Sequence, residues 1–149
     1  MSTNGPATLL FLQSGNQALS VHARIHIQDD THERWPEPMF DVEFVADAHP
    51  FHGTLTQMFT ASELTFLRHN IARLTEPDVI GGGIAFGGEG MVQFDLSFKA
   101  QVVGQPDRWI VDAALAPSDD PPVLRWRLVD QPPFLNGLIG AIDDLLGST

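Results

Sequence analysis

The sequence contains no cysteine, which excludes disulfide bonds, thiolate nucleophiles, iron–sulfur clusters and zinc sites built on thiolates. No apolar run approaches the ~20 residues that span a bilayer, and the run at 9–12 is too short for a signal peptide. Basic residues are scarce, because eight Lys and Arg stand against 19 Asp and Glu, for a net charge of −11. Nucleic acids and anionic membranes attract basic proteins. We therefore expect a cytoplasmic protein without a nucleic-acid or membrane partner.

The composition is that of a globular protein. Hydrophobic residues make up 43% of the chain and charged residues only 18%, a balance that favours a packed core over disorder. A chain of 149 residues is long enough to bury roughly two-thirds of its unfolded surface in one unit. We predict a single domain over residues 1–149.

Alternating apolar and polar residues predict strands. Residues 91–103 give the clearest case, with the apolar set Val92, Phe94, Leu96, Phe98, Ala100 and Val102. A period of two indicates a strand with one face on a core. Similar alternation marks residues 20–28, 39–47, 108–116 and 123–129. Short breaks between them favour a mostly antiparallel meander sheet of about seven or eight strands.

Two segments have the pattern of helices. Thr60 and Glu63 form a capping-box pattern, and apolar residues at spacings of three and four predict a helix over about 60–75. A second apolar-periodic segment predicts a helix over about 131–146, with Asp130 as its N-cap and Gly147 ending it in the left-handed conformation. The fold class is therefore α+β, with both helices packed against the sheet.

Familiar catalytic and metal-binding motifs are missing. The stretch 81–90, GGGIAFGGEG, lacks the spacing of a phosphate loop, so we interpret it as a flexible connection. His22 and His26 lie on a predicted strand, where their rings sit ~13 Å apart, and His49 and His52 lack a third ligand. No nucleophile elbow or paired carboxylates stand out. We predict no metal, no cofactor, no catalytic residues and no enzymatic activity.

The most distinctive surface segment is acidic. Residues 28–47 hold seven carboxylates and one arginine, which leaves −6, more than half of the net charge. Trp35 lies inside this segment, either as an exposed anchor or folded back onto the sheet. An aromatic side chain ringed by carboxylates suits a basic protein partner. The predicted partner-binding residues are Asp29, Asp30, Glu33, Trp35, Glu37, Asp41 and Glu43.

The order of motifs resembles a bacterial family. Trp35 precedes an early strand, Phe51-His52-Gly53 opens another, Glu63-Leu64 lies in the capped helix, and Gly83 lies in a small-residue stretch. The chain ends as strand-Asp-Gln, here Asp130-Gln131, followed by Leu135. This pattern over residues 35–146 is similar to that of WapI-type immunity proteins and related small domains of unknown function. The resemblance implies a non-catalytic protein that neutralises a toxin domain delivered by neighbouring cells.

These observations lead to one main hypothesis and two alternatives. The main hypothesis is an acidic, immunity-like binding protein, a monomer or weak homodimer, that neutralises a cationic toxin or similar partner. The first alternative is a small-molecule-binding or enzymatic domain, which would contain a deep cavity with convergent histidines and carboxylates. The second is a self-associating structural module with an exposed apolar strip on its second helix.

Overall fold

The computed structural model describes residues 6–26, 37–76, 81–87, 92–118 and 122–148. The elements in chain order are β1 (Ala7–Ser14), β2 (Gln17–Ile25), β3 (Met39–Ala48), β4 (Phe51–Thr60), α1 (Ala61–Arg73), β5 (Gly81–Phe86), β6 (Gln93–Val102), β7 (Gln105–Ala116), β8 (Leu124–Gln131) and α2 (Leu135–Gly147). The α+β class and the antiparallel pairing predicted from the sequence are confirmed. Neither helix in the described part of the chain is long and apolar enough to cross a membrane.

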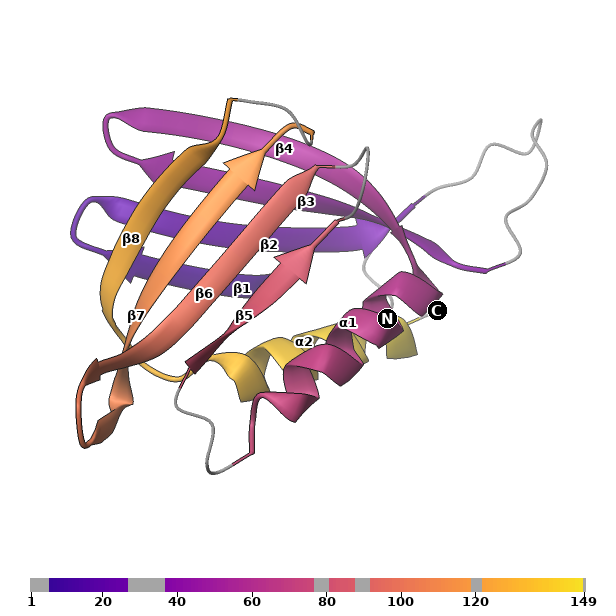
Figure 1. Cartoon of the computed structure of the whole chain (residues 1–149). Coiled ribbons are helices and arrows are strands. Elements are labelled where there is room, and N and C mark those ends of the chain that lie inside the picture. Colours follow the sequence, from indigo (N-terminus) through magenta and orange to yellow (C-terminus); the bar gives the residue numbers. More distant parts are fainter. Residues whose placement is uncertain (1–5, 27–36, 77–80, 88–91, 119–121, 149) are drawn as a thin grey trace.

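The strands form two sheets. Strands β1 to β4 make an N-terminal sheet and β5 to β8 make a C-terminal sheet, each in sequential antiparallel order. The strands of one sheet run steeply across those of the other, and α1 and α2 lie side by side along one end of the sandwich (Figure 1). The prediction of one continuous meander is corrected here, because α1 interrupts the chain between β4 and β5. Period-two patterning identifies strands, but it does not identify which strands pair.

Apolar side chains from both sheets meet in one core. The predicted inward set of β3, Phe40, Val42, Phe44 and Ala46, is completely buried. The Phe44 ring lies 4.8 Å from that of Phe94 and 5.5 Å from that of Phe86, measured between centroids. These separations are typical of favourable aromatic pairs. The C-terminal end of β6 extends beyond this core, so Val102 is exposed although its alternation predicted burial.

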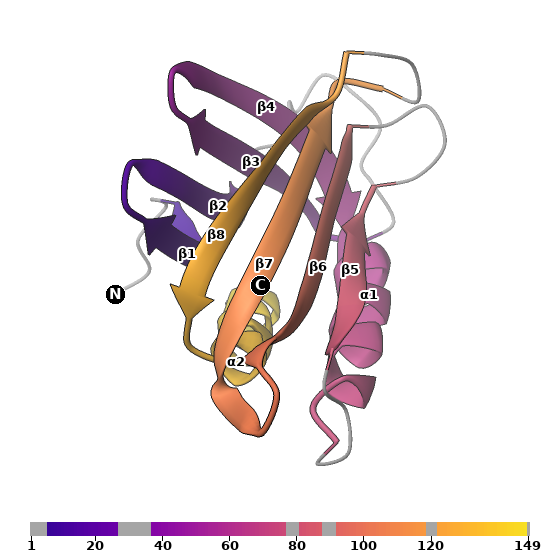
Figure 2. The same cartoon turned by 60° about the vertical axis from the view of Figure 1, so that its left-hand side comes forward.

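Helix α1 begins as the sequence predicts. The Glu63 backbone N–H donates to Thr60 Oγ1 over 3.0 Å, and the Thr60 backbone N–H donates to Glu63 Oε1 over 2.9 Å. Such a capping box satisfies two N–H groups that have no partner within the helix. Arg68 joins α1 to α2 through a two-point ion pair with Asp143, in which the Arg68 Nε–Asp143 Oδ1 distance is 3.0 Å. Figure 2 shows the two helices from a second side.

The junction between β8 and α2 differs from its prediction. Asp130 is exposed in β8 with a φ of 57°, a conformation that aspartate tolerates better than most residues. The N-cap of α2 is Phe134, without a side-chain hydrogen bond, and Ser148 rather than a left-handed Gly147 ends the helix. Gln131 is only 4% exposed. Its Nε2 donates to the backbone carbonyls of Gln13, at 2.7 Å, and Val129, at 2.9 Å.

The glycine-rich stretch begins as a strand, which corrects the predicted connection for residues 81–86. A Cβ added at Gly81 would lie 2.8 Å from the Phe98 carbonyl oxygen, and one at Gly82 would lie 2.9 Å from Leu74 Cδ2. Glycine therefore allows β5 to approach β6 and the end of α1 closely. Residues 88–90 of the same stretch lie outside the described residues.

Candidate functional site

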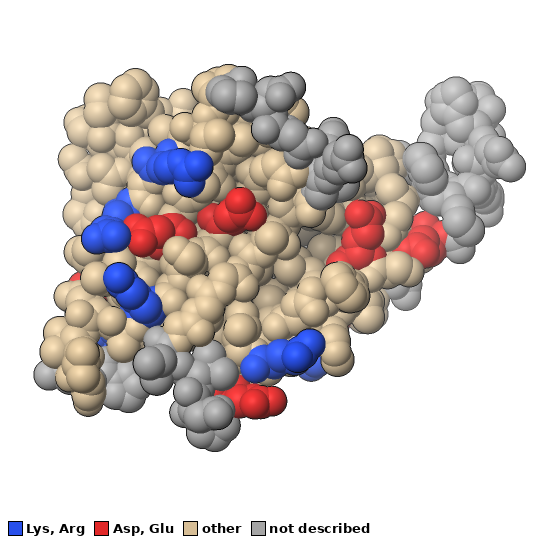
Figure 3. All heavy atoms as spheres, viewed as in Figure 1, with Lys and Arg blue, Asp and Glu red and all other residues tan. Residues whose placement is uncertain are grey.

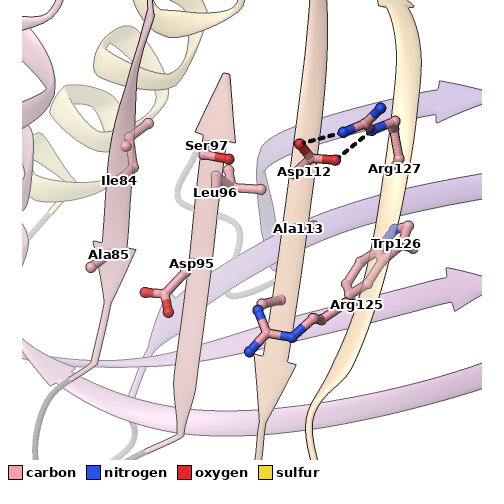
Figure 4. A pocket seen from close by; sticks show the side chains of 12 residues that line it. Ile84, Ala85, Asp95, Leu96, Ser97, Asp112, Ala113, Arg125, Trp126 and Arg127 are labelled. Atoms are coloured by element: carbon pink, nitrogen blue, oxygen red, sulfur yellow. Dashed lines mark hydrogen bonds and ion pairs between the residues drawn. The ribbon is translucent and has the colours of Figure 1, made fainter. Parts of the chain in front are cut away.

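The outer face of the C-terminal sheet is hollowed. A groove of about 720 Å³ runs across β5 to β8, and we call it the outer groove. Because Leu96, Ala113 and Trp126 point into the core, their chain neighbours point outward and line the groove. The small side chains of Gly83, Ala85, Ser97 and Ala114 leave the floor open (Figure 4).

Strand register arranges the outward residues in two parallel rows. One row consists of Ala85, Asp95, Ala114 and Arg125, and the next consists of Gly83, Ser97, Asp112 and Arg127. Each row takes one residue from each strand of the sheet. Residues far apart in the sequence are therefore neighbours in the groove, and both rows end in an arginine on β8.

The two arginines have different electrostatic environments. Arg127 makes a two-point ion pair with Asp112, at 2.7 Å from Nε to Oδ1 and 3.2 Å from its terminal nitrogen to Oδ2. The hydrogen bonds that Arg127 donates to Asp112 raise the pKa of Arg127 further above its already high usual value. Arg125 makes no ion pair with any described residue, and its side chain extends over β7 toward Asp95 (Figure 4). The groove thus offers one unpaired guanidinium and one unpaired carboxylate.

The charge on this face is opposite in sign to that of the whole chain. Among the described residues, Lys99, Arg125 and Arg127 face outward from β6 and β8 beside the acids Asp95 and Asp112, while Arg108 of β7 is paired with Asp130 of β8. These groups sum to +1, while the chain as a whole carries −11. Figure 3 shows Lys and Arg gathered over β7 and β8 around two acidic groups.

The structure describes three of the seven predicted partner-binding residues. Asp29, Asp30, Glu33 and Trp35 lie outside the described residues. Asp41 and Glu43 are together on the outer face of the N-terminal sheet, where they line a small hollow of about 180 Å³ with His22. His26 Nδ1 lies 3.0 Å from each carboxylate oxygen of Asp41.

Glu37, another predicted partner-binding residue, serves the fold. Its Oε1 accepts from the Ser62 backbone N–H over 2.8 Å, and its Oε2 accepts from the Ser62 hydroxyl over 2.9 Å. These two hydrogen bonds hold the pKa of Glu37 below its usual value. The carboxylate thus caps the first turn of α1, where negative charge is stabilised. A role of Glu37, Asp41 and Glu43 in partner binding stays a prediction.

Sequence reasoning missed the residues of the outer groove. The alternation in 108–116 and 123–129 already placed Asp112, Arg125 and Arg127 opposite the apolar face. Their convergence with Asp95 depends on strand register, which the alternation does not specify. Among the described residues, no three His, Cys, Asp or Glu side chains lie close enough to hold a metal ion.

Comparisons with known proteins identify a related fold. No protein-family model and no curated protein matches this chain. A solved structure of the plant transcriptional regulator PBF-2 is similar to it with a TM-score of 0.50 and 10% sequence identity, covering 99% of this chain and 84% of that one. The crystal structure of WHY1 from Arabidopsis thaliana gives a TM-score of 0.48 and 12% identity, covering 99% and 87%.

The PBF-2 likeness changes the functional expectation. Neutralisation of a cationic toxin and the exclusion of nucleic acid as a partner are both contradicted, because the chain shares its fold with a transcriptional regulator. That neighbour is a regulator rather than an enzyme. The physical error lay in using the net charge of the whole chain, since a ligand responds first to the face it touches. The resemblance to WapI-type proteins stays a prediction.

Proposed function

We propose that this protein binds single-stranded nucleic acid in the outer groove, without catalysis. The observation that carries the proposal is the local charge of +1 on the described part of this face, where Arg125 has no described ion-pair partner, in a chain whose net charge is −11. A guanidinium without a protein partner is suited to a phosphate group, which it contacts through parallel N–H donors. The shared fold with a transcriptional regulator supports the same class of ligand.

The shape of the groove favours a single strand over a duplex. Proteins that read duplex DNA usually insert a helix or a two-stranded ribbon into a groove of the DNA. The described part of this face is hollow and formed by the sheet itself. With strands ~4.8 Å apart, the four strands span roughly 14 Å. A flexible single strand fits such a surface because it can follow the hollow.

The two rows offer separate contacts to backbone and bases. Arg125 at the end of one row supplies a positive charge that holds a phosphate, and Lys99, next to the other row on β6, supplies a second; neither is paired with a described residue. Ser97 and Asp95 supply hydroxyl and carboxylate oxygens near the open floor, where base amino groups find acceptors.

The proposal is tested by fluorescence anisotropy with labelled oligothymidylate, oligouridylate and a duplex of matched length. We expect both single strands to bind, the duplex to bind more weakly, and log affinity to fall with log salt with a slope of about −1.4 if two unpaired cations replace counterions.

Two variants with equal net charge separate local from overall electrostatics. Arg125→Ala removes the unpaired guanidinium, while Arg24→Ala removes an exposed arginine on the outer face of the N-terminal sheet. We expect Arg125→Ala to weaken binding by roughly tenfold, as for the loss of a charged hydrogen bond, and Arg24→Ala to leave it unchanged. Absence of single-strand binding, or equal losses in both variants, would overturn the proposal.

A further inference from the structure

A second hollow lies on the other side of β8 from the outer groove. It has a volume of about 780 Å³ and lies between β8 and the hairpin that joins β3 to β4; we call it the edge hollow. Figure 1 shows this hairpin extending past β8, which is an edge strand of its sheet. The described residues that line the edge hollow include Phe51, Val123 and Leu124 beside the polar residues considered next.

The edge hollow combines an exposed aromatic ring with positive charge. Phe51 is 65% exposed and lines the edge hollow, so its ring is accessible from it. Arg125 and Arg127 line the same hollow, Arg127 while paired with Asp112 on β7, and no described carboxylate lines it. An aromatic ring beside arginines is the combination that binds single-stranded nucleic acid, since bases stack on the ring and phosphates contact the cations.

Two buried polar atoms below the hollow have no partner among the described residues. They are Nε1 of Trp126, whose side chain is more than nine-tenths buried, and Oε1 of Gln17. Both residues line the edge hollow. Buried donors and acceptors are normally satisfied, so a missing partner marks a place for a polar ligand or an ordered water. A base edge carries both donors and acceptors and reaches such atoms directly or through water.

The edge hollow and the outer groove meet at one segment. Arg125, Trp126 and Arg127 line both of them. We propose that a nucleobase of the strand bound in the outer groove enters the edge hollow and stacks on Phe51, while the strand crosses β8 over Arg125. The inference rests on the proposed function and adds a base-stacking subsite to it.

The chain provides a matched control for Phe51. Phe66 on α1 is 68% exposed, close to the 65% of Phe51, and lies outside both hollows. Phe51→Ala and Phe66→Ala therefore remove similar exposed apolar surface at two places. Because both rings are mostly in solvent, both variants are expected to fold, which circular dichroism checks. Phe51→Trp keeps an aromatic face and serves as the rescue variant.

The experiment measures binding of an oligothymidylate and of an abasic strand of equal length. We expect Phe51→Ala to weaken binding of the oligothymidylate by about 5- to 150-fold, the range for the loss of one stacked base, with Phe66→Ala unchanged and Phe51→Trp restored. The abasic strand should bind wild type and Phe51→Ala equally, because it has no base to stack.

The outcomes separate this inference from the proposed function. Equal effects of Phe51→Ala and Phe66→Ala, or equal affinity of wild type for the two strands, overturn the stacking subsite. The proposed function then still stands if Arg125→Ala loses binding and Arg24→Ala does not. If wild type binds neither strand, both proposals are refuted.

Discussion

Replacing Gln131 by methionine should destabilise the protein through two lost hydrogen bonds. Methionine has a similar length but no N–H donor, so it leaves the carbonyls of Gln13 and Val129 without the donor that lies 2.7 and 2.9 Å away. At ~1 kcal/mol for each bond, and with little change in volume, the free energy of unfolding should fall by about 2 kcal/mol. For a chain of this length, that lowers Tm by roughly 4 to 8 °C.

The assay is urea unfolding followed by tryptophan fluorescence, with Gln13→Met as the control. The Gln13 side chain is exposed, and its backbone carbonyl, which accepts from Gln131, is kept in this variant. We expect the control to stay within about 0.5 kcal/mol of wild type. If Gln131→Met is equally mild, these hydrogen bonds do not hold β8 against β1. A second consequence concerns binding, because β8 carries Arg125 and a looser β8 should also weaken binding of a single strand.

Two further predictions concern α1 and β5. The hydrogen bonds from Ser62 lower the pKa of Glu37 in the folded protein, so the ionised carboxylate stabilises the fold. This stabilisation is complete above the usual pKa of 4.5 and is lost as pH falls through the lower pKa of the folded state. Unfolding curves from neutral to acidic pH should show this loss, and Glu37→Gln should remove this part of the pH dependence. Gly81→Val should destabilise the fold by about 1 to 3 kcal/mol, because its Cβ meets the Phe98 carbonyl. Thermal unfolding measures this loss. An unchanged Tm would contradict the close approach of β5 to β6.

Local patterns identified the elements of the fold. The inward face of β3 and the capping box of α1 follow from residues next to each other in the sequence, and both are observed. The split into two sheets does not follow from neighbouring residues, because it depends on whether β4 and β5 pair across α1. The strand at 81–86 was hidden because glycine has low strand propensity, and its use here depends on backbone contacts with Phe98.

Asp130-Gln131 shows a different limit of sequence analysis. An aspartate shortly before prolines and an apolar helix has the pattern of an N-cap, yet Asp130 remains in β8 with positive φ. Gln131 then points inward and bonds to β1, which lies more than a hundred residues earlier in the chain. No local signal marks that partner. The pair turns the chain between a strand and a helix, as predicted, but through Gln131 rather than through an Asp130 cap.

The outer groove was also missed because its residues come from distant parts of the sequence. Each row takes residues from four strands, and only the complete register brings Asp95 and Arg125 to one surface. The acidic segment was easier to notice because it is contiguous, but Glu37 in it caps α1. A contiguous run of like charges can be read from the sequence, whereas a set of residues aligned across a sheet cannot.

The acidic chain and its proposed anionic ligand are compatible when distance is considered. Asp41 and Glu43 face outward from the N-terminal sheet, so both sheets separate them from the outer groove. Packed sheets lie ~10 Å apart, and the Debye length at 0.1 M salt is also ~10 Å. Repulsion from that face is therefore largely screened, while Arg125 contacts a phosphate directly. Since Arg125 and Lys99 are the unpaired cations among the described residues of this face, the affinity must depend on stacking and hydrogen bonds more than on charge, which makes Phe51 as important as Arg125.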